Sequence, residues 1–137
     1  MDAATGRPQA MFPVGSDGLS QSLSEHGGTL YAAVSDGSSY GSTLYAVDGR
    51  SGKQRWKLRT DRAVRSTTVP SDEAVYFSSG NGGPAVLHAV DPASAQTLWT
   101  ATLGHGFWYS APVVSKEAVF VCAGEESGKS TLTAFNR

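Results

Sequence analysis

The sequence predicts an all-β fold built from repeated units of four short strands. A motif recurs along the chain: Leu44–Asp48 is an apolar run ending in Asp, a turn follows, and Trp56 stands eight residues after that Asp. The same pattern returns from Leu87 through Asp91 to Trp99. Between the copies, short runs rich in aromatic and β-branched residues alternate with Gly- and Ser-rich stretches, and no window shows helical spacing of apolar residues.

The motif has a regular period. Its anchor positions are Asp2, Asp48, Asp91 and Asn136, at spacings of 46, 43 and 45 residues, which is typical of a repeat architecture. The second strand of each unit does not alternate cleanly between apolar and polar residues, which favours a sheet covered on both faces. Four-stranded units of this kind, stacked around an axis, indicate propeller blades.

We therefore predict a partial β-propeller of about three four-stranded antiparallel blades in a single segment, residues 1–137. The predicted parts are a lone fourth strand at 7–14, blade 1 at 19–58, blade 2 at 66–103 and an incomplete blade 3 at 108–137. The lone strand is what the third blade lacks. We expect the ring to be completed by missing blades of a longer chain or by a second copy, because three blades alone leave open faces and strand edges that invite association.

The pattern resembles the pyrroloquinoline-quinone-type (PQQ-like) propeller repeat. The matching residues are Asp48, Ser51, Gly52, Trp56, Asp91, Ser94, Trp99, Ser110, Pro112, Val113 and Val114. Three positions depart from it, since Ala10 replaces the first Trp, Ala95 a turn Gly and Asn136 the last Asp. Gly suits a positive φ in the turn, the Asp side chain can cap backbone N–H groups, and Trp can wedge between sheets. Asp48, Gly52, Trp56, Asp91 and Trp99 are thus predicted as structural residues of the repeat.

The resemblance implies a function and a location. Chains with this repeat are similar to the propeller portion of bacterial receptor-like kinases and to the envelope lipoprotein that assists outer-membrane barrel assembly. We therefore expect a non-enzymatic scaffold for protein or ligand interaction or sensing, at an extracytoplasmic or cell-envelope location.

The alternative is a fragment of a quinoprotein (PQQ-dependent) dehydrogenase. The resemblance implies that such enzymes hold their cofactor with a calcium ion, acidic and amide side chains and often adjacent cysteines. This chain has one cysteine, Cys122, in an apolar run where we expect it to be a small core residue. We accordingly expect no cofactor, no metal and no catalytic residue in this segment.

Composition and the remaining motifs point away from several function classes. The net charge of −1 does not indicate a nucleic-acid partner, and no apolar run reaches the ~20 residues of a membrane span. Residues 37–41 match Gly-x-Ser-x-Gly, but a predicted strand follows where a nucleophile elbow needs a helix. Residues 123–130 resemble a degenerate phosphate-binding loop with the same defect. The histidines lie in different units, without metal-ligand spacing.

One loop, residues 104–109, carries more aromatic residues than a turn requires. We predict that it lies with the other long loops at one end of the blades, opposite the Asp turns. Its side chains form a candidate binding rim for a protein or small ligand, namely His105, Trp108 and Tyr109. The alternative interpretation is that Phe107 and Trp108 cover a blade interface. We expect Trp56 and Trp99 to be buried and Trp108 to be more exposed.

Overall fold

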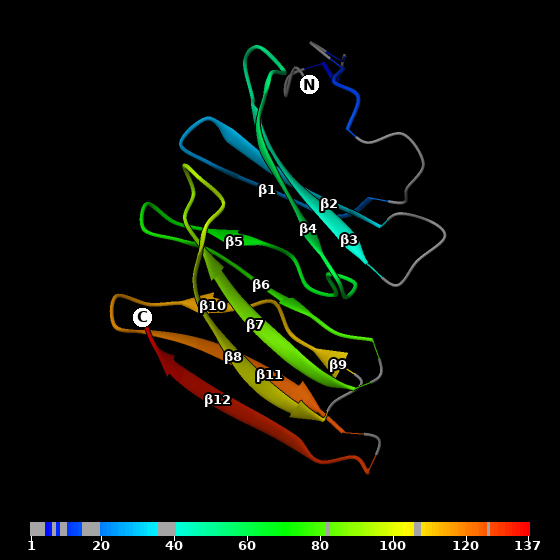
Figure 1. Cartoon of the computed structure of the whole chain (residues 1–137), viewed down its shortest axis with the longest axis vertical. Helices are drawn as coiled ribbons and strands as arrows, with labels where there is room; N and C mark the ends of the chain where they lie inside the picture. Colours follow the sequence, from blue (N-terminus) through cyan, green and yellow to red (C-terminus); the bar gives the residue numbers. More distant parts are fainter. Residues whose placement is uncertain are drawn as a thin grey trace.

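The computed structural model describes residues 5, 6, 8, 11–14, 20–35, 41–81, 83–105, 108–125 and 127–137, with the backbone alone at 20, 21, 105 and 108. These residues form twelve strands in three antiparallel sheets, which are stacked along the long axis of the molecule (Figure 1). None of the described residues is helical, and so none lies in an apolar helix of membrane-spanning length. The predicted all-β, partial-propeller fold is confirmed.

The strands follow the predicted order. Sheet 1 contains β1 (Ser20–His26), β2 (Thr29–Ser35), β3 (Ser42–Asp48) and β4 (Gln54–Thr60). Sheet 2 contains β5 (Val69–Pro70), β6 (Val75–Ser79), β7 (Pro84–Val90) and β8 (Thr97–His105). Sheet 3 contains β9 (Trp108–Tyr109), β10 (Val113–Val114), β11 (Ala118–Gly124) and β12 (Ser130–Asn136). In sheets 1 and 2 each strand pairs with the next, whereas β9 and β10 of sheet 3 both pair with β11. Sheet 3 therefore has three strand positions where the other sheets have four.

Each sheet has a forward face, toward the following sheet, and a rear face, toward the preceding one. The cross-strand register defines equivalent positions: Tyr31 pairs with Ala46 and Ala46 with Trp56, as Tyr76 pairs with Ala89 and Ala89 with Trp99. By this register the forward faces carry Tyr31, Ala33, Leu44, Ala46 and Trp56 in sheet 1, Tyr76, Ser78, Leu87, Ala89 and Trp99 in sheet 2, and Phe120, Cys122, Leu132 and Ala134 in sheet 3.

Two apolar cores hold the sheets together. The forward face of sheet 1 packs against Val75, Phe77 and Val90 on the rear face of sheet 2. The forward face of sheet 2 packs in the same way against Val119 and Val121 of sheet 3. The central strand β6 buries residues on both of its faces, and it shows the continuous burial expected of a doubly covered strand.

The Asp motif forms the same turn twice. The Asp48 carboxylate accepts hydrogen bonds from the backbone N–H groups of Arg50 and Ser51 at 3.1 and 2.8 Å, and its other oxygen accepts one from Arg55 at 2.7 Å. In the second copy, Asp91 caps the equivalent N–H groups at 2.9 and 2.8 Å. These hydrogen bonds hold the pKa of each Asp below its ordinary value. Both Asp side chains thus cap backbone N–H groups of their own turns.

The fourth residue after each Asp has a positive φ. The values are 68° at Gly6, 71° at Gly52 and 62° at Ala95. A side chain in this conformation costs of order 1 kcal/mol, and Ala95 is held there because its methyl group belongs to the core between sheets 1 and 2.

The repeat tryptophans each lie against a tyrosine of the same sheet. The ring centroids are 5.9 Å apart, with planes at 50°, in both Tyr31–Trp56 and Tyr76–Trp99. Trp56 is 8% exposed, and its indole N–H donates to the carbonyl oxygen of Pro92 in the next turn at 2.7 Å. Trp99 is only half-buried, so the prediction of burial is confirmed for Trp56 alone.

Two sequence-based expectations are corrected. Cys122 is exposed rather than part of the core, because it lies on the forward face of sheet 3, which no described residue covers. Residues 11–14, predicted to lie within a lone fourth strand at 7–14, form no strand. Phe12 instead lies against Gly52, where an added Cβ atom would stand 2.2 Å from the ring.

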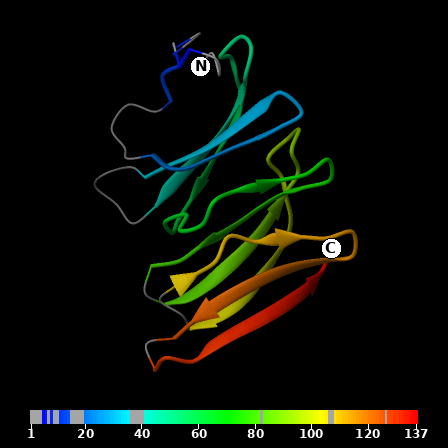
Figure 2. The same cartoon turned by 180° about the vertical axis from the view of Figure 1, so that it is seen from behind.

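The two ends of the sheets differ. The β1–β2, β5–β6 and β10–β11 hairpins lie at one end with the β3–β4 and β7–β8 Asp turns (Figures 1 and 2). The described parts of the longer connections, β4–β5, β6–β7, β8–β9 and β11–β12, lie at the opposite end. We call this opposite end the loop end.

Candidate binding surface at the loop end

The loop end is built on the connection between sheets 1 and 2. Residues 61–66 run along the end of sheet 2, where Ala63 accepts a hydrogen bond from the N–H of Gly80 at 3.0 Å and Arg65 donates to Ser78 at 3.1 Å. Val64 between them is fully buried, and its N–H donates to the hydroxyl of Ser42 in sheet 1 at 3.0 Å. This connection is therefore a fixed backbone platform between the two sheets.

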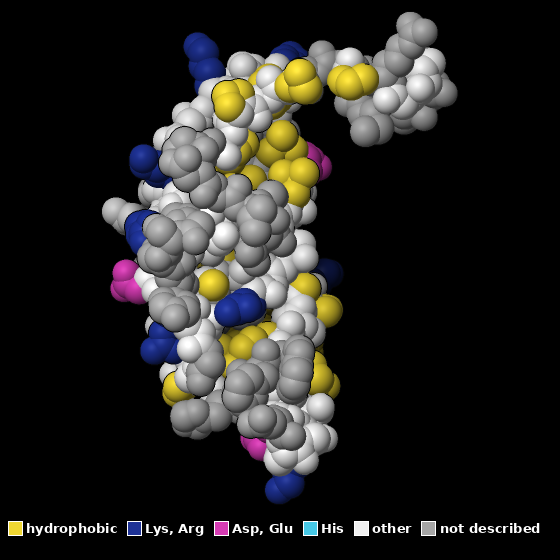
Figure 3. Space-filling model, turned by 90° about the vertical axis from the view of Figure 1, so that its right-hand side faces the viewer, with side chains coloured by type: hydrophobic (Ala, Val, Ile, Leu, Met, Phe, Trp, Pro, Cys, Tyr) yellow, Lys and Arg dark blue, Asp and Glu magenta, His cyan; other side chains and the backbone are white. Residues whose placement is uncertain are grey.

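Two arginines of the platform reach over the β6–β7 loop. Arg62 donates to the carbonyl oxygen of Pro84, and the guanidinium of Arg65 donates to that of Gly80 at 3.3 Å. The side-chain amide oxygen of Asn81 closes the loop by accepting from the N–H of Ala63 at 2.9 Å. Figure 3 looks onto this end, where Lys and Arg side chains border hydrophobic ones. These arginines belong to none of the sequence motifs, and their place in an inter-blade connection is the sequence feature that points to them.

The predicted rim lies beside this platform. His105 ends β8 opposite Pro84, and Trp108 and Tyr109 form β9, paired with the end of β11. The side chain of Tyr109 is half-buried, with its ring 3.7 Å from the point where a Cβ atom on Gly80 would stand. The side chains of His105 and Trp108 lie outside the described part of the structure, as does Phe107. The rim therefore remains a prediction, with Tyr109 as its described contact to sheet 2.

The two loop motifs do not form the structures that their chemistry needs. Residues 37–40 of the Gly-x-Ser-x-Gly sequence lie outside the described residues, and β3 begins directly after Gly41. The stretch at 123–130 ends β11, turns with a hydrogen bond from Gly128 to Glu125 at 3.0 Å, and enters β12 at Ser130. Both loops are strand connections, without the helix that follows a nucleophile elbow or a phosphate cradle.

The histidines occupy separate environments. His26 is exposed and lies 2.7 Å from a carboxylate oxygen of Asp72 across sheets 1 and 2. His88 lies in sheet 2, stacked on Phe77 with ring centroids 4.7 Å apart. Among the described residues, no three His, Cys, Asp or Glu side chains gather as a group that could hold a metal ion.

A cleft with a volume of about 240 Å³ lies between β4 and sheet 2. Its lining includes His88, whose Nε2 is 2.8 Å from the hydroxyl of Ser79. Burial lowers the pKa of His88 to about 4, so the ring is neutral at pH 7. Because Ser79 is 2% exposed, this pair is part of the packing and its hydroxyl is not accessible as a nucleophile.

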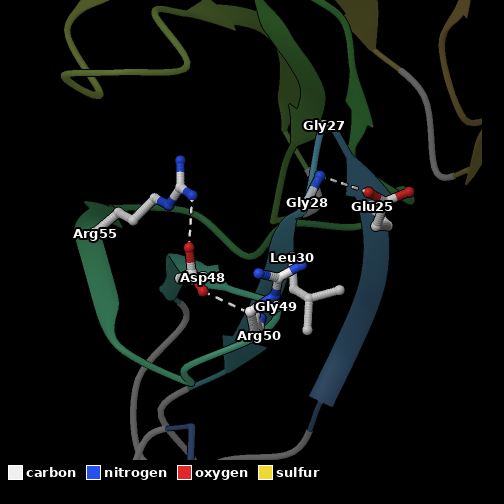
Figure 4. A pocket seen from close by; sticks show the side chains of 8 residues that line it. All are labelled: Glu25, Gly27, Gly28, Leu30, Asp48, Gly49, Arg50 and Arg55. Atoms are coloured by element: carbon white, nitrogen blue, oxygen red, sulfur yellow. Dashed lines mark hydrogen bonds and ion pairs between the residues drawn. The ribbon is translucent and has the colours of Figure 1, made fainter.

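A larger and more open pocket, of about 650 Å³, lies at the Asp-turn end of sheet 1 (Figure 4). Glu25 accepts a hydrogen bond from the N–H of Gly28 at 2.8 Å, and Arg55 pairs with Asp48 at the opposite side. Glu25, Asp48 and Arg55 of this pocket are thus engaged in contacts within sheet 1 and its turns, and we take the loop end as the better candidate for recognition.

Comparison with known proteins identifies the family. The family model described as "Outer membrane protein assembly factor BamB" matches this chain over residues 1–85 and 40–137. The chain belongs to this family of PQQ-like propellers. The two overlapping matches run through all three sheets, as expected when the repeats of the model fit the chain in more than one register. A comparison with curated protein sequences found no match.

Solved structures agree on the fold. BamB from Moraxella catarrhalis has a TM-score of 0.60 and 19% identity, over 83% of this chain and 32% of that one. Quinohemoprotein alcohol dehydrogenase ADHIIG from Pseudomonas putida HK5 has a TM-score of 0.59 and 14% identity, over 74% and 20%. A europium-containing methanol dehydrogenase has 0.58 and 18%, over 87% and 24%. This chain thus matches a third or less of the length of each, and the likeness shows the propeller fold.

Proposed function

We propose that this chain is a non-enzymatic propeller scaffold that binds a protein partner in the assembly of outer-membrane proteins at the cell envelope. The match of the BamB family model to all three sheets supports this role. The loop end is the surface that we assign to binding, because its connections hold side chains on a platform that is already ordered.

The single observation that carries the assignment is the fixed connection between sheets 1 and 2. Arg62 and Arg65 extend from it, and Tyr109 packs beside it. Arg and Tyr are enriched among the residues that dominate binding energy at protein interfaces, and a platform that is ordered before binding lowers the entropy lost on association. The backbones of His105 and Trp108 also lie at the loop end, and we therefore include these two residues in the proposed surface.

The test is the level of folded outer-membrane barrel proteins in the host. Deletion of the gene should lower that level, and the wild-type gene should restore it. A gene encoding Arg65→Ala and Tyr109→Ala should restore it less, whereas Leu98→Ala, on an exposed residue of β8, should restore it fully. Normal barrel levels in the deletion strain would contradict the role. Equal restoration by both variants would contradict the assignment of partner binding to the loop end.

The second candidate is a fragment of a quinoprotein dehydrogenase, which the likeness to the two dehydrogenase structures favours. It is tested by titrating the purified chain with pyrroloquinoline quinone and Ca²⁺. Saturable binding, with a change in quinone absorbance and a raised melting temperature, would support the dehydrogenase. An unchanged spectrum and melting temperature would leave the scaffold as the better proposal.

A further inference from the structure

The two outer faces of the stack expose apolar residues that the inner faces bury. Among the described residues, three of the five large apolar side chains that are exposed lie on them: Leu23 at 64% on the rear face of sheet 1, and Val113 at 64% and Leu132 at 69% on the forward face of sheet 3. At the position of Leu132, sheets 1 and 2 carry Leu44 and Leu87, both fully buried. The same residue type is thus exposed where the next sheet is missing.

Leu23 and Val113 each have an equivalent residue at the interface between sheets 1 and 2, and these two equivalent residues contact one another. Leu23 faces Ala32 in sheet 1, which makes it equivalent to Thr68 of sheet 2. Val113 faces Phe120 in sheet 3, which makes it equivalent to Ser24 of sheet 1. The hydroxyls of Ser24 and Thr68 are 2.6 Å apart across the sheet 1–sheet 2 interface. If sheet 3 of one copy were covered by sheet 1 of another, Val113 would meet Leu23.

The N-terminal segment lies where a preceding sheet would place its fourth strand. Trp56, from the fourth strand of sheet 1, packs on the Asp91 turn of sheet 2, in the core that also contains Ala95. Phe12 packs in the same way on Gly52, the residue equivalent to Ala95. Phe12 and Val14 also line an apolar groove of about 390 Å³ over β2 and β3, which would take the forward face of a preceding sheet.

Sheet 3 lacks the strand that this segment could supply. β12 pairs with β11 on one side, and no described residue pairs with its other edge. Pro8 and Pro13 flank Phe12, and proline is tolerated in a sheet at an outermost strand, which donates few hydrogen bonds to a neighbour. The segment therefore suits the outer edge of β12.

We propose that two copies of this chain close into one six-bladed ring. In each copy, residues 11–14 form the fourth strand of the partner's sheet 3, with Phe12 two residues beyond Ala10, which stands at the repeat Trp position. The rear face of sheet 1 covers the partner's forward face, so that Leu23 meets Val113 of the partner. Both contacts repeat interfaces that sheets 1, 2 and 3 already make, and six blades lie within the ~4–8 of known propellers.

A charge-exchange experiment tests the pairing of the two faces. Light scattering on the purified chain at micromolar concentration should give the mass of a dimer. Leu23→Glu or Val113→Lys alone should raise the dimer dissociation constant at least tenfold, because each buries an unpaired charge. The double variant Leu23→Glu, Val113→Lys should recover much of that loss, since each interface then holds an ion pair. Leu98→Glu, on an exposed residue away from both faces, is the matched control.

A cross-link tests the strand exchange. By the repeat register, in which Ala10 stands at the position of Trp56, Pro13 is equivalent to Arg59 and should lie opposite Thr131 of the partner, as Arg59 lies opposite Thr43. Pro13→Cys with Thr131→Cys, in a Cys122→Ser background, should give a disulfide-linked dimer on mild oxidation, because these two positions lie at opposite ends of one chain. Pro13→Cys with Leu98→Cys should stay uncross-linked.

The thiol of Cys122 gives an independent measurement on the unaltered protein. It is exposed in the single chain and would be buried in the ring, so its reaction with a thiol reagent should slow as the protein concentration rises. A monodisperse, cooperatively folded monomer with a reactive Cys122 would overturn the proposal and assign the faces to further blades of a longer polypeptide. Dimers or larger species that neither cross-link nor respond to charge exchange would equally overturn it.

Discussion

Equivalent positions in the three sheets carry different residues, and the differences follow from what lies opposite each one. Ala33, Ser78 and Cys122 share one forward-face position. Ala33 and Ser78 are fully buried, whereas Cys122 is exposed because no described residue covers sheet 3. The hydroxyl of Ser78 has no hydrogen-bond partner, so this position carries a desolvation cost in sheet 2 that it does not carry in sheet 1.

Replacing Ser78 with the alanine found at the equivalent position should stabilise the protein. Ser78→Ala removes a buried, unpaired hydroxyl and leaves the backbone N–H bond to Ser66 in place. We expect the free energy of unfolding to rise by about 1 kcal/mol in a urea titration. Cys122→Ala is the control, since this position is exposed in the monomer, and under conditions where the protein is monomeric the change should alter the free energy of unfolding little. A destabilised Ser78→Ala variant would show that the hydroxyl has an unseen partner, such as a buried water.

The two repeat tryptophans should differ in their contribution to stability. Trp56→Ala should lower the free energy of unfolding by about 3–5 kcal/mol, because it empties a core site and leaves the carbonyl oxygen of Pro92 without its indole donor. Trp99 is half-buried, and Trp99→Ala should cost less. Chemical denaturation of both variants, under conditions where the protein is monomeric, measures the difference. Equal losses would contradict the difference in burial.

His88 should make stability depend on pH. Its pKa is about 4 in the folded protein against an ordinary 6.5, so the unfolded chain binds a proton first as the pH falls. Stability should be level above pH 6.5 and fall by about 3 kcal/mol in total between pH 6.5 and 4. His88→Gln keeps a partner for Ser79 without this titration. The free energy of unfolding of the His88→Gln variant should therefore vary less over the same pH range. Parallel pH dependences for the wild type and the variant would refute the assignment of this effect to His88.

At the scale of elements, the Asp turns are the common building unit of the sheets. Each turn joins a third to a fourth strand, and its side facing the preceding sheet receives an aromatic ring. Trp56 packs on the second turn and Phe12 on the first. The turn therefore links neighbouring blades as well as neighbouring strands. The first turn also provides the packing contact of the N-terminal segment, through Gly52 and Phe12.

Gly52 allows a test of this contact. Gly52→Ala introduces a Cβ atom at a φ of 71°, 2.2 Å from the ring of Phe12. Gly28→Ala has the same backbone penalty at 78° but meets no atom within 4 Å. We expect Gly52→Ala to cost at least about 1 kcal/mol more than Gly28→Ala, and to raise proteolysis of the N-terminal segment. The extra cost should vanish in a Phe12→Ala background.

At the scale of the whole molecule, the three sheets are unequally covered. Among the described residues, sheet 2 has a neighbouring sheet on both faces, whereas sheets 1 and 3 each have one. Burial on both faces should make sheet 2 the last to open in the native state. The number of covered faces, rather than strand length, should therefore set the order of stability.

Hydrogen exchange measures this order. In a monomeric Leu132→Asp variant, the amides of β6 and β7 should be the most protected, and those of β11 and β12 less so, because the forward face of sheet 3 is open. Under dimeric conditions the wild-type protein should gain protection in β12. Uniform protection of all three sheets in the monomeric variant would mean that the stack opens as one unit.

The repeat, the four-strand unit and the Asp turns can all be predicted from the amino-acid sequence. These features depend on local chemistry: Asp48 and Asp91 cap N–H groups two and three residues away, and the following turn needs a positive φ at its fourth position. The order and approximate bounds of the strands follow from the turn and loop residues that separate the short apolar runs. The exception is the segment at 11–14, whose partner strand would have to come from elsewhere.

Which apolar residues form the core, by contrast, depends on how the sheets stack. Leu87 and Leu132 occupy the same position, and one is buried while the other is 69% exposed. The platform of Arg62 and Arg65 likewise depends on hydrogen bonds to a loop some twenty residues away. Burial and long-range hydrogen bonds depend on which sheet face lies opposite, and a repeating sequence presents the same pattern whether or not that face is present.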